Sequence, residues 1–278
     1  TAIESVESQS ALGRIGDDIA SRVTAAGLGF KMHIDKLVGS ISKLVGNTAG
    51  SIHTAKATVR GELRTKVYNE MMELLQPGDV LLDKTRFALT DKLIPGHFGH
   101  VALWLGSGTE MEDLGLFNSG INRQSWRRAN QYKYKLLEGA SVLEALRPGV
   151  QVNTLEHFLN VDVVAIIRWK EATKENIGPV LFRGLYHLGQ EYDFNFDVNS
   201  SNTIVCSELV YQAFPQTINW TTNESLGRPT ISPDAVAQMA GNGSADELPF
   251  EVIYYHDSGQ SYTCKEATEV YLQALAGE

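Results

Sequence analysis

The sequence predicts an α+β protein built from two regions with different patterns of apolar residues. Residues 1–75 carry apolar side chains three or four positions apart, as on one face of a helix, and almost no strand signal. From residue 76 onward, short apolar runs alternate with turns and helical segments. Pro77, which cannot continue a helix, separates the two patterns. We therefore expect an N-terminal amphipathic helical region at 1–75 and a mixed domain at 76–278.

The N-terminal region predicts two or three amphipathic helices. Their apolar positions are Ile15, Ile19 and Val23; Ile34, Leu37, Ile41 and Leu44; and Val59, Leu63, Val67 and Leu74. Such stripes must be buried if the helices are stable in water. We favour a cap packed on the second region over a contact with a second copy or a membrane. The polar faces mix acids and bases, and the stripes do not continue through several heptads.

The second region predicts short strands and a few helices. We expect strands at 77–83, 100–105, 141–152, 161–169 and 250–256, the most β-branched of which, 161–169, should be central. Helices are expected at 175–190, from Cys206 onward, at 233–240 after the N-cap Ser232, and after Thr263. Residues 107–140 look polar and irregular, with aromatic side chains that could line a cleft.

Composition and charge exclude some function classes. The chain has 278 residues, of which 43% are hydrophobic and 21% charged, and its formal net charge is −9. The acidic balance argues against a nucleic-acid partner, because phosphate binding relies on clustered Lys and Arg. No apolar run approaches the roughly 18 to 20 residues that span a bilayer, although peripheral membrane contact stays open. Because the chain begins at Thr1, we expect a processed or trimmed N-terminus, and we favour a periplasmic or secreted protein. The oligomeric state is left open.

Cys206 is the leading candidate nucleophile. It follows the β-branched run Thr203–Val205 and opens a segment with the apolar spacing of a helix. The positive end of the helix macrodipole and its unpaired N–H groups favour the thiolate, which is the nucleophilic form of cysteine. The alternative is that Cys206 is a small buried hydrophobe. The other cysteine, Cys264, has no base in view, and we expect two free thiols with different roles.

A thiolate nucleophile needs a base and, behind it, a group that orients the base. Of the seven histidines, His100 ranks first because it stands at the mouth of an apolar strand beside a Pro-Gly loop; His97, in that loop, ranks second. Glu144 lies in an apolar strand, where an acid needs a partner or a raised pKa. Histidine, acid and cysteine are the parts of a thiol catalytic triad. A metal site of His97, His100 and Cys206 is the weaker alternative, because a zinc site needs a more complete ligand pattern.

Together with their flanking residues, these three positions resemble the circularly permuted papain-like enzymes of the NlpC/P60 superfamily, in particular the YiiX-like group. The resemblance covers about residues 77–240, with histidine before cysteine. It rests on PGDVLLD from 77, GHVALWLG from 99, VLEALRPGVQV from 142, EYDFNFD from 191, CSELVYQAF from 206 and ISPDAVA from 231.

The resemblance implies a permuted papain-like fold, with the cysteine helix packed on a small antiparallel sheet and a triad of Cys206, His100 and Glu144. It suggests Tyr192 as a hydroxyl that helps to hold an oxyanion, and a packing role is the alternative for Tyr192. It implies a bacterial cysteine amidase or peptidase, acting on cell-wall peptides or related amides through a thioester and without a cofactor. A thiol acyltransferase or lipid hydrolase is the second reading, with the apolar loop 86–96 as an acyl-binding lip. A binding module with an inert triad is the third.

Overall fold

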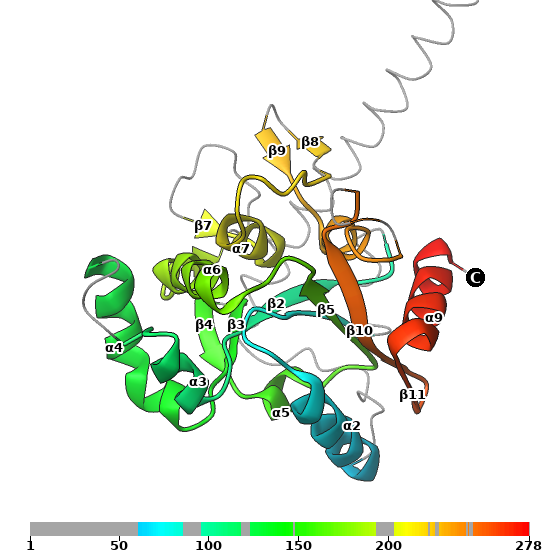
Figure 1. The fold of residues 1–278 in the computed structure, drawn as a ribbon, viewed down its shortest axis with the longest axis horizontal. Helices are drawn as coiled ribbons and strands as arrows, with labels where there is room; N and C mark the ends of the chain where they lie inside the picture. Colours follow the sequence, from blue (N-terminus) through cyan, green and yellow to red (C-terminus); the bar gives the residue numbers. More distant parts are fainter. Residues whose placement is uncertain are drawn as a thin grey trace, which may run out of the picture. The chain divides into compact units, whose positions relative to one another are not determined.

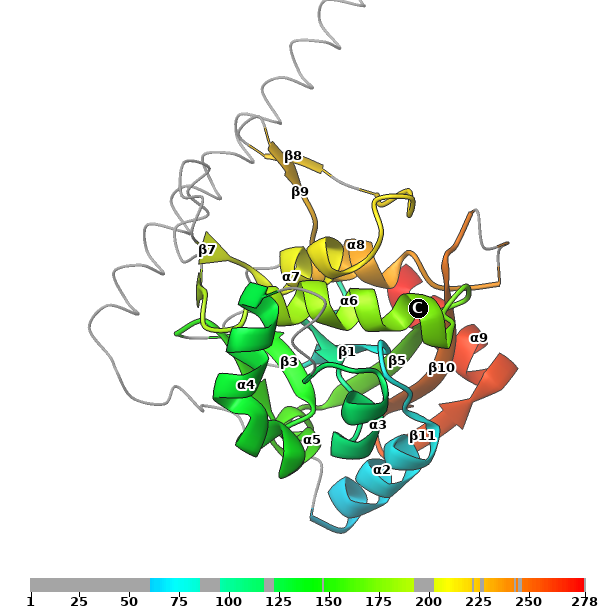
Figure 2. The ribbon, with the colours of Figure 1, turned by 60° about the vertical axis from the view of Figure 1, so that its left-hand side comes forward.

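The computed structural model describes residues 61–85, 96–117, 123–146, 148–192, 203–221, 223–225, 228–242, 244 and 247–277. All of them fall within one unit of the chain, His53–Glu278 (Figures 1 and 2). The apolar stripes expected up to Val59 lie outside the described residues. The N-terminal cap and the division between residues 75 and 76 therefore stay predictions.

An antiparallel sheet forms the centre of this unit (Figure 1). Among the described residues it has seven strands in the order β11-β10-β5-β1-β2-β3-β4. Two small two-stranded sheets accompany it, one parallel (β6 with β7) and one antiparallel (β8 with β9). The strands are β1 (Val80–Lys84), β2 (His100–Trp104), β3 (Val142–Ala145), β4 (Val150–Asn153), β5 (Val163–Trp169), β6 (Glu191–Tyr192), β7 (Thr203–Ile204), β8 (Asn223–Ser225), β9 (Arg228–Thr230), β10 (Phe250–Asp257) and β11 (Gln260–Thr263).

Helices cover both faces of the sheet (Figure 2). The helices are α2 (Gly61–Leu74), α3 (Gly108–Asp113), α4 (Arg123–Leu137), α5 (Leu155–Phe158), α6 (Lys174–Tyr186), α7 (Cys206–Ala213), α8 (Pro233–Ala237) and α9 (Cys264–Ala276). Because side chains alternate along a strand, Val80 and Leu82 of β1 face the core shared with α6 and α7, whereas Leu81 faces the core shared with α2 and α5. The predicted α+β class and antiparallel sheet are confirmed.

Helix α2 confirms the third predicted N-terminal helix over its described residues. Val67 and Met71, one turn apart, are buried in the core that α2 shares with α5. Glu70, the residue before Met71, accepts a hydrogen bond of 2.8 Å from the Tyr254 hydroxyl on β10. The apolar face of α2 is thus covered by the sheet of the same unit.

Two sequence-based expectations were wrong. Residues 107–140 are not irregular, because they contain α3 and α4. Ser107 opens α3 with a capping box, in which its hydroxyl accepts from the Glu110 N–H at 3.3 Å and the Glu110 carboxylate accepts from the Ser107 N–H at 2.8 Å. The many polar residues of α4 hid its helical period, although Leu136 is fully buried. The stretch 141–152, expected as one strand, is the antiparallel hairpin of β3 and β4.

Candidate active site

Cys206 stands at the first position of α7. The segment before it is extended: β7 pairs in parallel with β6, and Val205 has φ −96° and ψ 165°. Helix α7 packs against β2 through its apolar face, with Leu209 and Val210 fully buried. Because the Val205 side chain has no acceptor, it does not cap the first-turn N–H groups of the helix. The thiol is therefore held at a helix N-terminus, as the sequence predicts, and is 6% exposed.

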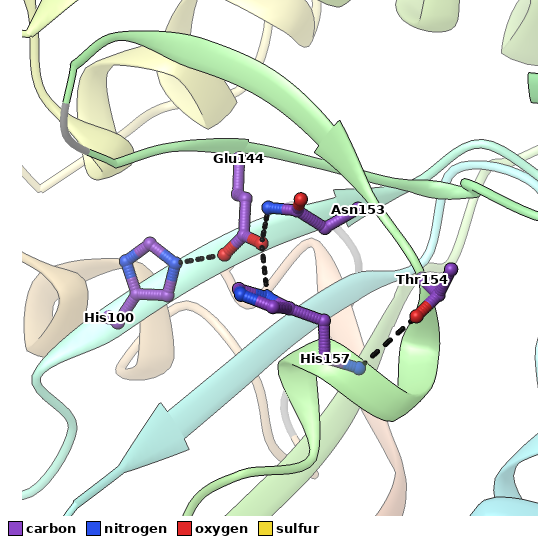
Figure 3. A network of polar contacts seen from close by, with 5 residues as sticks. All are labelled: His100, Glu144, Asn153, Thr154 and His157. Atoms are coloured by element: carbon purple, nitrogen blue, oxygen red, sulfur yellow. Dashed lines mark hydrogen bonds and ion pairs between the residues drawn. The ribbon is translucent and has the colours of Figure 1, made fainter. Parts of the chain in front are cut away.

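His100 is the first residue of β2 and faces a carboxylate. Its Nε2 is 2.8 Å from Glu144 Oε2 (Figure 3), and Cys206 is close enough to the ring to raise the pKa of His100. Since Nε2 faces Glu144, Nδ1 is the ring nitrogen left for the sulfur. Burial alone would lower the pKa of His100. The negative charge and hydrogen bond of Cys206, the hydrogen bond with Glu144 and the charge of Asp83 outweigh burial and raise that pKa well above its usual value.

Glu144 is a buried carboxylate with both oxygens engaged (Figure 3). Oε2 contacts His100, and Oε1 accepts a hydrogen bond of 2.7 Å from Asn153 Nδ2. His157 of α5, whose side chain is 60% exposed, brings Nδ1 to 3.8 Å from the same Oε1. Burial would raise the pKa of Glu144, but His100, Asn153 and His157 together lower it. The acid is therefore held ionised, facing the imidazole.

The loop before β2 is fastened by the ISPDAVA segment. Asp234 Oδ1 accepts hydrogen bonds from the backbone N–H groups of His97, at 2.8 Å, and Phe98, at 3.1 Å. Gly96, with φ +129°, lies so close to Asp234 that a Cβ would collide with that side chain. The His97 ring contacts the Tyr255 hydroxyl at 3.2 Å. Of the two histidines ranked from the sequence, the structure therefore brings His100 to Glu144 and turns His97 toward β10.

Other expected site features are placed only in part. The backbone of Tyr192 pairs with Ile204, two residues before Cys206, but the tyrosine side chain lies outside the described residues. So do residues 86–95 of the expected acyl-binding lip. Within the part of the chain that the structure describes, no group of three or more His, Cys, Asp or Glu side chains is arranged to hold a metal ion. The described helices also include none long and apolar enough to cross a membrane.

Three residues around the site were missed by sequence reasoning. Asn153 and Glu144 project from the same face of the β3–β4 hairpin, which period-two alternation would have shown had the hairpin been recognised. His157 follows on α5, whose N-cap is Thr154. Asp83 follows the apolar run of β1 and is 7% exposed. A carboxylate at the end of an apolar strand was the sequence signal that could have identified it.

A comparison with known families agrees with this arrangement. A model of the permuted papain-like amidases of the YaeF/YiiX type, peptidase family C92, matches residues 74–274. The chain belongs to this family. The match covers the main sheet and α7, and also residues 241–274, beyond the segment that resembled the family in the sequence. No curated protein and no solved structure matches the chain. Membership in the C92 family implies a cysteine amidase with an amide substrate.

Proposed function

We propose that this protein hydrolyses an amide bond through a thioester acyl-enzyme, with Cys206 as nucleophile, His100 as acid and base, and Glu144 as the group that orients His100. The observation that carries the proposal is the contact of 2.8 Å between His100 Nε2 and Glu144 Oε2, together with the effect of Cys206, which raises the pKa of the same imidazole. The same three parts, with the same division of work, operate in unrelated cysteine and serine hydrolases.

Acylation begins from a thiolate–imidazolium pair. The Cys206 sulfur attacks the carbonyl carbon of the amide and forms a tetrahedral intermediate. His100 then donates its Nδ1 proton to the amide nitrogen, the C–N bond breaks, and the amine leaves. In deacylation His100 takes a proton from water, the hydroxide attacks the thioester, and the carboxylic acid is released while the sulfur leaves as thiolate. The proton that His100 gains from water restores the starting pair.

The N-terminus of α7 is the natural site for the negative charge that develops on the carbonyl oxygen. Its first-turn N–H groups are not capped by Val205 and lie beside the attacking sulfur. Tyr192 is proposed as an additional donor, because its backbone pairs with the strand that leads into Cys206. A cell-wall peptide or a related amide is the proposed substrate class. The acyltransferase or lipase reading relied on the loop 86–96 and gains no support from the described residues.

Competitive alkylation of the two cysteines tests the proposal. Cys206 is buried and Cys264 is exposed, so accessibility alone favours faster modification of Cys264. We expect the reverse near neutral pH with iodoacetamide, because α7 and the imidazolium of His100 stabilise the Cys206 thiolate. Mass mapping of the labelled peptides over time gives both rates in one sample.

The matched control is His100→Ala, which removes the charged partner and keeps both thiols. It should slow the labelling of Cys206 and leave that of Cys264 unchanged. Equal or faster labelling of Cys264 in the folded wild-type protein would contradict the nucleophile assignment. It would favour a binding module with an inert triad.

A further inference from the structure

Asp83 is a second buried carboxyl group beside His100. The two residues are directly opposite each other on the antiparallel strands β1 and β2, and opposed residues of such a pair project from the same face of the sheet. The Asp83 backbone carbonyl also accepts the Gly99 N–H at 3.0 Å, which fixes the chain just before His100. The reaction proposed above gives Asp83 no role, although it is only 7% exposed.

The neighbours of Asp83 on the described elements show which charges it meets. On β2 it faces His100, and Glu144 of β3 follows one strand further. On β5 the opposite residue is the apolar Val164. Beyond Val164 lies His256 of β10, whose Nδ1 is 3.0 Å from the Ser261 hydroxyl.

Three further titratable groups stand near Asp83 without facing it directly. Lys84, the next residue, alternates to the other face of β1. His157 of α5 lies beside Glu144, and Cys206 lies beyond His100. His100 is thus the cation that Asp83 directly faces among the described residues.

We propose that Asp83 is a positioning residue, a second counter-ion that keeps His100 charged, and that protonation of Asp83 withdraws this support in mildly acid solution. The inference rests on the proposed pairing of Cys206 with His100. It adds a residue that acts through His100 and does not itself touch the reacting atoms.

The electrostatics of Asp83, His100 and Glu144 agree with the geometry. Burial raises the pKa of Asp83 to about 6, with His100 opposing the rise and Glu144 adding to it. Asp83 in turn contributes to the raised pKa of His100. Asp83 is therefore neutral in acid and ionised above about pH 6. Because its charge acts on the imidazole, its ionisation favours the imidazolium and with it the Cys206 thiolate.

The pH dependence of Cys206 alkylation tests the proposal without a substrate. In the wild-type protein we expect the iodoacetamide rate at Cys206 to show a several-fold rise centred near pH 6. In Asp83→Asn this rise should be absent, and the rate above it should stay several-fold lower. Glu269→Gln, which removes an exposed acid on α9, is the control and should keep the wild-type profile. A rise near pH 6 that persists in Asp83→Asn would overturn the inference.

Thermal melting separates this role from a structural one. A carboxyl whose pKa is higher in the folded than in the unfolded protein costs stability as pH rises from the unfolded toward the folded value. Asp83→Asn should therefore match the wild-type melting temperature at pH 4 and exceed it at pH 7. A variant that melts lower at both pH values would identify Asp83 as a packing residue and contradict the proposal. If Asp83→Asn does not fold, Asp83→Ser carries the same two predictions.

The His100→Ala variant distinguishes a failure of the proposed catalytic pair from a failure of the role proposed for Asp83. If His100→Ala leaves Cys206 labelling unchanged, the proposed catalytic pair fails and the role of Asp83 falls with it. If His100→Ala slows the labelling but Asp83→Asn keeps the rise near pH 6, the pair stands and only the role of Asp83 is wrong.

Discussion

Replacing Glu144 by glutamine is expected to lower the turnover of acyl 4-nitroanilides by about 10- to 10⁴-fold while leaving the fold intact, the upper end being the cost of the equivalent change in a serine triad. The two oxygens of Glu144 accept from two donors, His100 and Asn153. A glutamine amide has one oxygen, so its NH₂ group must face one of them. If the NH₂ faces His100, it favours the tautomer with a proton on Nδ1, which cannot accept the thiol proton. The negative partner of the imidazolium is also lost.

The control for this prediction is Asn153→Ala. It removes the hydrogen bond to Oε1 and keeps the carboxylate beside His100. Its loss of turnover should therefore be smaller than that of Glu144→Gln. Circular dichroism and melting curves establish that both variants are folded. Unchanged turnover in Glu144→Gln would assign the third position to another acid, and Asp83, as the other carboxyl beside His100, would be tested first.

Removal of Arg168 is expected to cause a large loss of stability. Its guanidinium binds the buried Asp79 with two hydrogen bonds of 2.7 Å and also donates to the Leu74 carbonyl, again at 2.7 Å. These contacts join β5 to the residue just before β1 and to the end of α2. Arg168→Met would leave the carboxylate of Asp79, which is 1% exposed, without its cation. Breaking a buried ion pair in this way costs about 3–5 kcal/mol in the free energy of unfolding, measurable by urea denaturation at pH 7.

Two comparisons make the Arg168 prediction specific. Lys66 and Glu70 form an ion pair at 3.5 Å on the surface of α2, and Lys66→Met should cost no more than about 0.5 kcal/mol. Burial already raises the pKa of Asp79, although Arg168 opposes the rise. Without Arg168 the acid should take up a proton more readily, so the loss of stability should shrink as the pH is lowered. A loss below about 1 kcal/mol at pH 7 would contradict the importance of this pair.

The parts of the fold that could be predicted from the sequence are those with a clear local signal. The β-branched run at 161–169 predicted β5, and the change from β-branched to helix-forming residues at Cys206 predicted the start of α7. Where the local signal was weak, the prediction failed. The helix α4 was missed because few of its described side chains are buried, and the hairpin of β3 and β4 was merged because both strands are only four residues long.

The residues of the candidate site likewise divide into those with a local sequence signal and those without one. His100, Glu144 and Cys206 could be named because each breaks a local pattern: a histidine at the start of an apolar strand, an acid within one, and a thiol at a helix start. Asn153 and Asp83 could not, because their importance depends on strand pairing. Asp83 meets His100 only through the register of β1 and β2, and Asn153 meets Glu144 only through the register of the hairpin. Pairing between strands is set by long-range contacts that a local pattern does not contain.

The charge state of His100 tests the central claim most directly, because the account requires a thiolate–imidazolium pair in the resting protein. Its imidazole resonances, assigned by their loss in His100→Gln, can be followed by NMR as a function of pH. We predict that His100 is protonated at pH 7, and that Cys206→Ser shifts its titration to lower pH by removing the charge that most strongly favours the imidazolium. A His100 that is neutral at pH 7 and titrates identically in Cys206→Ser would contradict the account.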